Sequence, residues 1–182
     1  MDPLEIIQKY YDPYSRAYYF LIHHSRLVAK KALEIAERAR HLDTDRKFME
    51  EAAMLHDIGI FFTSAPKIGC YGYKEYVCHG YLGRELLERE GLPVHAPMCE
   101  RHVGLGLTAE EIKKNRLPLP ERDMVPLSIE EKIICLADKF FSKNEHDLLH
   151  EKPLEKVREI VKGYGEDKLR LFDEWLKEFS PK

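Results

Sequence analysis

Histidine and aspartate residues that could bind metal ions recur through the chain, and two of the aspartates stand in apolar surroundings. The candidates are His24, the pair His56-Asp57, His79, His102 and Asp138. Asp57 and Asp138 interrupt apolar runs that should face a core, where an ionised carboxylate is strongly disfavoured unless a cation or hydrogen-bond donors compensate it. Because neutral imidazole is the commonest metal ligand in proteins, the set of six residues predicts a metal site.

The prediction depends on the whole set of six residues, because a lone histidine at a helix end more often caps the helix or packs in the core than binds a metal. One rival arrangement is a small zinc site formed by Cys78-His79 and Cys99-x-x-His102. It would leave His24, Asp57 and Asp138 without an explanation, so we favour the larger set. The cysteines form no Cys-x-x-Cys pair, and we expect them to be reduced thiols. They are Cys70, Cys78, Cys99 and Cys135.

The composition suits one soluble globular domain. The chain has 182 residues, of which 44% are hydrophobic and 34% are charged. Its formal net charge of −3 argues against a general nucleic-acid partner, which would need a basic surplus. No apolar stretch approaches the roughly 20 residues needed to cross a bilayer, and the N-terminus lacks the pattern of a secretory signal. We therefore expect a cytoplasmic protein without a membrane partner.

Apolar spacing is helical along nearly the whole chain, which predicts an all-α fold, a compact multi-helix bundle. Asp43 or Thr44 could cap a helix that Gly59 ends, and Thr108-x-x-Glu111 and Ser128-x-x-Glu131 are capping boxes that open two more. The final two helices, at about 154–162 and 165–178, carry no candidate chemistry. Earlier helices are expected at about 3–11, 14–22, 24–40, 45–57, 79–90 and 94–102, with loops at about 58–77 and 116–127.

The order and context of the candidate ligands resemble the HD superfamily of metal-dependent phosphohydrolases, whose fingerprint is a His, a His-Asp pair and a distant Asp. The matching stretches are His24-Ser-Arg-Leu-Val-Ala, Leu55-His-Asp-Ile-Gly59 and Leu136-Ala-Asp-Lys139, within a core of about residues 20–145. Three other segments are similar to a poorly characterised HDIG-type subgroup. They are Glu100-Arg-His-Val-Gly-Leu-Gly106, Leu117-Pro-Leu-Pro and Ile129-Glu-Glu-Lys-Ile-Ile.

The resemblance implies two metal ions in each chain, because His79 and His102 match the additional ligands of dinuclear members. One metal would be held by His24, His56, Asp57 and Asp138. The second would be held by His79 and His102, with Asp57 bridging the two. Mixed imidazole and carboxylate ligands suit Fe or Mn, with Zn, Ni, Co or Mg as alternatives.

The resemblance further implies hydrolysis of a phosphate ester or anhydride, with a nucleotide or related small molecule as substrate. A pair of metals could supply the activated hydroxide for this reaction. The transferring phosphoryl group needs positive charge, for which Lys139 and Arg101 are the leading candidates beside the bridging Asp57. Arg84 and Lys67 are weaker candidates. Three aromatic residues of the 58–77 loop could stack on a base, namely Tyr71, Tyr73 and Tyr76.

Two other functions remain open at this point. One is a di-iron oxygenase, since a branch of the superfamily uses similar ligands to activate O₂. Its phosphonate-cleaving members have His-Asp-x-x-His, whereas this chain has Ile60 at the last position. The other is a non-catalytic nucleotide-sensing module, which would not require a complete ligand set. Ile60 also replaces a Lys found in many dinuclear hydrolases of the family, which weakens a direct link to its cyclic-dinucleotide phosphodiesterases.

Overall fold

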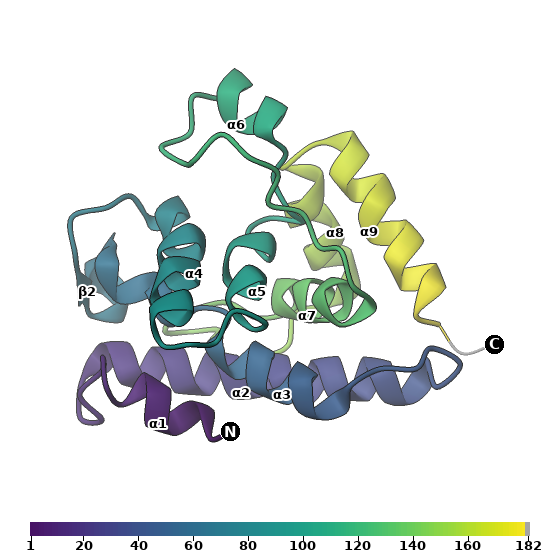
Figure 1. Ribbon diagram of the computed structural model, residues 1–182. Coiled ribbons are helices and arrows are strands. Elements are labelled where there is room, and N and C mark those ends of the chain that lie inside the picture. The colour runs from purple at the N-terminus through teal and green to yellow at the C-terminus, as the bar shows by residue number, and fades with distance from the viewer. Residues whose placement is uncertain (181–182) are drawn as a thin grey trace.

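The computed structural model describes residues 1–180, and it confirms the all-α fold class (Figure 1). Its α-helices are α1 (Pro3–Ile7), α2 (Arg16–Arg38), α3 (Arg46–Leu55), α4 (His79–Arg89), α5 (Ala96–Arg101), α6 (Ala109–Lys114), α7 (Ile129–Lys139), α8 (Leu154–Lys162) and α9 (Glu166–Glu178). Short 3₁₀ helices η1 (Ile58–Phe62), η2 (Pro66–Ile68) and η3 (Tyr76–Cys78) and an antiparallel pair β1 (Ser64–Ala65) and β2 (Cys70–Tyr71) lie between α3 and α4. None of the helices within residues 1–180 is long and apolar enough to span a bilayer.

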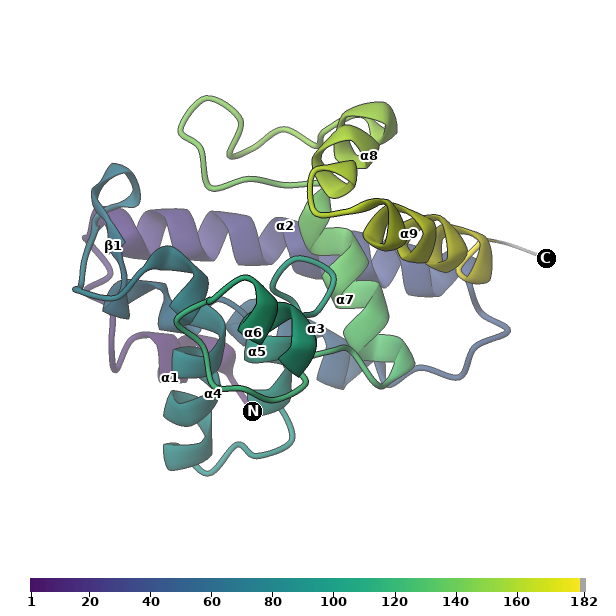
Figure 2. The same cartoon turned by 90° about the horizontal axis from the view of Figure 1, so that it is seen from above.

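The long helix α2 lies along one side of the molecule, and both α3 and α7 pack against it (Figure 1). Seen from above, α7 crosses α2 (Figure 2). The buried face of α2 carries Ala29, Ala32 and Ala36, whose small side chains let the neighbouring helices approach closely. Ile133 and Ile134 of α7 fill the space above them. This packing brings the middle of α2 close to the end of α7.

The candidate ligands lie where two hydrophobic clusters meet. Along α2, Leu21 belongs to the cluster that contains α1, η1 and α4, and Val28 belongs to the cluster that contains α7 and α9. His24 stands between them. Along α3, Ala53 and Leu55 fall in different clusters in the same way, immediately before His56. The candidate ligands are therefore buried at the junction between two apolar clusters.

A glycine makes the close approach of η1 to α4 possible. A Cβ added at Gly59 would lie 2.2 Å from the carbonyl oxygen of His79 and 2.5 Å from the backbone nitrogen of Gly83. These distances are too short for any other residue at position 59 without a shift of the backbone. Gly59 was expected to end the helix before it, but α3 already ends at Leu55, with His56 as its C-cap. The absence of a side chain at Gly59 thus allows the segment that contains Asp57 to lie against His79.

Several predicted boundaries are wrong near the N-terminus. The first helix ends at Ile7 instead of about residue 11, and the segments at 14–22 and 24–40 form one helix, because His23 and His24 continue it. The N-cap of α3 is Asp45, whose side chain accepts from Phe48 N, and not Asp43 or Thr44. The 58–77 loop contains short regular elements.

The remaining boundaries hold closely. Both capping boxes are present, at Thr108 and Ser128, and residues 116–127 are an irregular segment. Helices α4 and α5, and the C-terminal pair α8 and α9, each begin and end within about two residues of the predicted bounds.

Candidate metal centre

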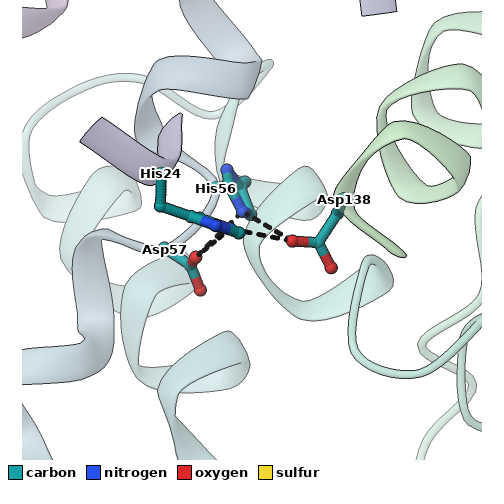
Figure 3. Close-up of side chains that lie close together, drawn as sticks. All are labelled: His24, His56, Asp57 and Asp138. Atoms are coloured by element: carbon teal, nitrogen blue, oxygen red, sulfur yellow. Dashed lines mark hydrogen bonds and ion pairs between the residues drawn. The ribbon is translucent and has the colours of Figure 1, made fainter. Parts of the chain in front are cut away.

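Four of the six predicted ligands form one group (Figure 3). His24 comes from the middle of α2, His56 and Asp57 directly follow α3, and Asp138 lies near the end of α7. His24 Nε2 is 2.9 Å from Asp138 Oδ1 and 3.2 Å from Asp57 Oδ2. His56 Nε2 is 2.9 Å from Asp57 Oδ2 and 3.5 Å from Asp138 Oδ1. One ligand atom from each residue lies within 4.8 Å of the others, which is close enough for all four to contact one cation.

The other two histidines form a second group around Asp57. His79 is the first residue of α4, and His102 is the C-cap of α5. Their Nε2 atoms are 3.3 and 3.5 Å from Asp57 Oδ1 and 3.1 Å from each other. Asp57 therefore presents Oδ2 to the first group and Oδ1 to the second, as a bridging carboxylate would.

Backbone carbonyl groups orient three of the four histidine rings. Nδ1 of His56 lies 2.7 Å from the Ala53 carbonyl oxygen, and Nδ1 of His79 lies 2.5 Å from that of Tyr76. His102 makes a longer contact of the same kind, 3.3 Å to Met98. A carbonyl oxygen only accepts hydrogen bonds, so each Nδ1 carries a proton and donates it. In the neutral imidazole the lone pair then lies on Nε2, which points at the carboxylates and is available to a metal.

The donor set fits a divalent cation on physical grounds. His56 Nε2 and both oxygens of Asp57 are buried and lack a hydrogen bond of good geometry within residues 1–180, although Lys143 Nζ lies 2.6 Å from Asp57 Oδ2. The Nε2 atoms of His79 and His102 face each other at 3.1 Å, and two lone pairs at that distance repel. Buried carboxylates and lone pairs without partners are costly, and a shared cation relieves both costs. No cysteine within residues 1–180 joins either group, which leaves the rival zinc site without support.

Nearby cations keep both carboxylates ionised. Burial alone would raise the pKa of Asp57, but the positive charges of His56 and Lys143 hold it well below its usual value. Burial opposes ionisation of Asp138 as well, and the charge of Lys139 outweighs it, so that its pKa is also well below the usual value. Each carboxylate therefore carries a full negative charge at neutral pH.

The pKa values of the buried histidines are shifted in opposite directions by their surroundings. Burial would lower the pKa of His56, but Asp57 and Asp138 raise it to about 9. Burial dominates at His79 and lowers its pKa to about 3, and burial likewise lowers the pKa of His102. The two histidines of the second group are therefore neutral and ready to bind a metal at pH 7, whereas at His56 a metal must displace a proton.

Among the basic residues expected near a substrate, Lys139 lies beside the candidate ligands Asp138 and His102. Its Nζ is 2.8 Å from Asp138 Oδ2 and 3.1 Å from the His102 carbonyl oxygen. Arg101 instead donates from Nη1 to Glu131 Oε1 at 2.6 Å, outside both ligand groups. Arg84 is paired with Glu88 and Glu100.

Sequence reasoning missed Lys143. Its Nζ lies 2.6 Å from Asp57 Oδ2 and 3.2 Å from His24 Nε2, and the side chain is nearly buried. Helix α7 ends at Lys139, and the chain then turns so that Lys143 reaches back to the ligands. The one signal in the sequence was its place four residues after Lys139, shortly after the apolar pair Phe140-Phe141.

A cavity of about 440 Å³ adjoins the two ligand groups. His79, His102 and Asp138 line its inner end, together with Lys139 and Lys143. The outer walls come from the segment after His102, from α6, and from the turn between α8 and α9. They include Leu105, Leu107, Glu111, Asn115, Leu117, Tyr164 and Lys168. The C-terminal helices, which were expected to carry no chemistry, thus contribute to this cavity.

Only one of the aromatic residues proposed for base stacking reaches the cavity. Tyr76 lines it, and the Tyr76 ring lies 4.7 Å from the His79 ring. Tyr71 and Tyr73 are 80% and 86% exposed and do not belong to its lining.

Comparison with known proteins agrees with this geometry. The HD-domain family model matches residues 21–142, a stretch that contains all six candidate ligands. The chain belongs to the HD-domain family. Its fold is also that of the HD domain of the L. monocytogenes phosphodiesterase PgpH, with a TM-score of 0.52. That match covers 87% of this chain and 82% of the PgpH domain at 17% identity, a level at which the likeness shows the fold alone.

The chain spans about a third of the length of the curated methyltransferases that it matches. A tRNA (cytidine(56)-2'-O)-methyltransferase of Picrophilus torridus is 34% identical over 123 residues, which is 67% of this chain and 31% of the methyltransferase. An uncharacterized protein of Methanocaldococcus jannaschii is 31% identical over 121 residues, 65% of this chain and 64% of that protein. Because the chain spans about a third of the methyltransferase, methyl transfer does not follow for it.

Proposed function

We propose that this HD-domain protein is a metal-dependent phosphohydrolase that acts on a nucleotide or a related small phosphate ester or anhydride. The observation that supports this most strongly is the placement of Asp57, whose two oxygens face two separate groups of ligand atoms. We assign His24, His56, Asp57 and Asp138 to one metal. His79 and His102 hold a second, with Asp57 shared, and Fe or Mn suits this mixed ligand set.

The bound cations would activate water and stabilise the oxygens of the phosphoryl group. The protein's own residues complete the site in two ways. Asp57 fixes the two ligand groups relative to each other, because one carboxylate belongs to both. The cavity beside them admits a small molecule, since its volume of about 440 Å³ lies in the usual range for such sites.

Lys143 and Lys139 supply positive charge at the inner end of the cavity, where the phosphoryl oxygens of the substrate would lie. Lys143 has the stronger case for direct contact. The Lys139 ammonium group is bound by the Asp138 carboxylate and the His102 carbonyl oxygen. Lys143 lines two cavities and lies 2.6 Å from Asp57 Oδ2, the carboxylate shared by both ligand groups.

We assign Arg101 an indirect role. Its guanidinium pairs with Glu131, and the Glu131 carboxylate also forms the capping box at the start of α7. The ion pair therefore links the helix that ends beside His102 to the helix that carries Asp138. Arg101 is on this account a positioning residue.

The oxygenase alternative gains nothing from the geometry. Ile60 stands where the phosphonate-cleaving branch has a histidine, and its side chain is fully buried and offers no ligand atom. We therefore keep hydrolysis as the proposed reaction.

A panel of phosphate esters tests the proposal. Protein loaded anaerobically with Fe²⁺ or Mn²⁺ would be assayed for phosphate release from nucleoside mono-, di- and triphosphates, with O₂ uptake followed in parallel. We expect phosphate release that chelators abolish and added metal restores. O₂ consumption without hydrolysis would favour the oxygenase. Tight nucleotide binding without turnover under any metal would favour the sensing module.

A further inference from the structure

The cavity beside the ligand groups has two chemically different ends. The inner end carries the charged groups described above. The outer end is largely apolar, because Leu105, Leu107 and Leu117 form its walls. Four side chains at this end carry other chemistry: the aromatic ring of Tyr164, the amide of Asn115, and Lys168 and Glu111, which form an ion pair with each other. The space therefore suits an amphipathic ligand whose anionic part lies at the inner end.

Tyr164 comes from outside the part of the chain that the HD-domain model matches, which ends at residue 142. It occupies the turn between α8 and α9, flanked by Gly163 and Gly165. The Tyr164 side chain is 52% exposed although it lines the cavity. A half-exposed tyrosine at a cavity mouth leaves one face of its ring available for contact with a ligand.

A buried lysine on α9 fixes this outer end in place. Lys168 Nζ donates to the Gly106 carbonyl oxygen at 2.9 Å and pairs with Glu111 Oε1 at 2.8 Å. It thereby joins α9, α6 and the segment that follows His102. Gly106 has φ of +85°, and an added Cβ would lie 2.8 Å from Val125, so this segment depends on glycine. These contacts hold together the outer wall, in which Tyr164, Asn115 and the leucines line the same cavity.

We propose that this outer end is a binding subsite for the nucleobase of a nucleotide, with Tyr164 stacking on the base and Asn115 contacting its polar edge. This inference rests on the proposed function, since the inner end would hold the phosphate. A flat heteroaromatic ring matches apolar walls, one aromatic side chain and one amide. A sugar phosphate would instead need several free hydrogen-bonding groups, whereas Lys168 and Glu111 already bind each other.

Steady-state kinetics on two substrates test the subsite. Metal-loaded wild type and Tyr164→Ala would be assayed with a nucleoside monophosphate and with ribose 5-phosphate, which has no base. We expect Tyr164→Ala to raise KM for the nucleotide about tenfold, within the range of base–aromatic stacking. kcat should change little, and KM for ribose 5-phosphate should stay the same. Tyr164→Phe should retain the nucleotide KM, and Tyr14→Ala, at a 98% exposed tyrosine elsewhere, should behave as wild type.

A binding measurement separates this inference from the proposed reaction. Adenosine, guanosine, cytidine and uridine would be titrated calorimetrically into metal-loaded wild type, Tyr164→Ala and Tyr14→Ala. We expect at least one nucleoside to bind wild type and Tyr14→Ala, and to bind Tyr164→Ala about tenfold more weakly.

Each outcome bears on one claim or the other. Nucleoside binding that depends on Tyr164, without phosphate release from any ester, would preserve the subsite and reject the hydrolase. Hydrolysis of both esters with equal KM values, and no nucleoside binding, would overturn the subsite and leave the hydrolase intact. Binding of a nucleoside that Tyr164→Ala does not weaken would also overturn it.

Discussion

The two ligand groups share Asp57 but differ in their construction. The first group comes from α2, the end of α3 and α7, which pack together through the main core, and it includes two carboxylates with a raised pKa at His56. The second relies on His79, at the start of α4, and on His102, at the end of α5, and both histidines line the cavity. The difference indicates a site with two carboxylates and a raised histidine pKa beside a site whose two histidines have lowered pKa values and line the cavity.

Removal of Asp57 should have the largest effect, because each group loses a ligand. We expect Asp57→Ala to lose both metals and all detectable phosphatase activity, as measured by elemental analysis and phosphate release. Asp43→Ala, at an exposed aspartate, should retain both. Full activity in Asp57→Ala would show that the ligand assignment is wrong.

Loss of the Lys143 charge should reduce activity without removing metals. Lys143→Met should lower kcat/KM about 100-fold, the usual cost of losing one donor to a developing charge. The Lys139→Met variant should impair catalysis more than folding, and Lys30→Met, at a 75% exposed lysine, should have no effect. Metal content and thermal unfolding of each variant provide the controls. A folding defect with normal specific activity in Lys143→Met would contradict a role in substrate binding.

Gly59→Ala should disturb the second group more than the first. The added methyl group would collide with the His79 carbonyl, and such overpacking costs about 1–3 kcal/mol. We expect a lower midpoint in denaturant unfolding, together with weaker binding of the second metal. Gly163→Ala is the matched control, because its φ is helical and its closest new contact is 3.1 Å. Equal stability of the two variants would contradict this prediction, because it would show that η1 and α4 can move apart at little energetic cost.

The smallest expected effect is a difference of about one proton in the number that each ligand group releases when it binds a metal. The pKa of His56 is raised to about 9, so metal-stripped protein holds a proton there at pH 7.5. Metal binding should therefore release about one proton from the first group at pH 7.5 and none well above pH 9. His79, with its pKa of about 3, releases none. Calorimetry in two buffers of different ionisation enthalpy measures this number, and no release at pH 7.5 would contradict the assignment.

The fold class and the six candidate ligands could be predicted because each depends on local patterns. Helical apolar spacing identifies the helices, and a carboxylate within an apolar run, as at Asp138, is visible without any structure. The gathering of these residues into two groups agrees with the resemblance to the HD superfamily.

Lys143 and Tyr164 could not be predicted, because their roles depend on how the chain returns after α7. From the sequence alone, Lys143 resembles a charged surface residue. In the structure, the turn after Lys139 brings its side chain to Asp57. Tyr164 becomes part of the cavity wall only when α8 and α9 pack beside α7. Nonlocal packing of this kind leaves no periodic signal in the sequence.

Metal content per chain tests the central claim most directly. Anaerobically purified wild type, His79→Ala and His41→Ala, whose histidine is exposed, would be measured by elemental analysis. The account predicts two metals in wild type and His41→Ala, and one in His79→Ala, with an unchanged fold. One metal in all three proteins would contradict the dinuclear site and would reduce His79 and His102 to structural residues.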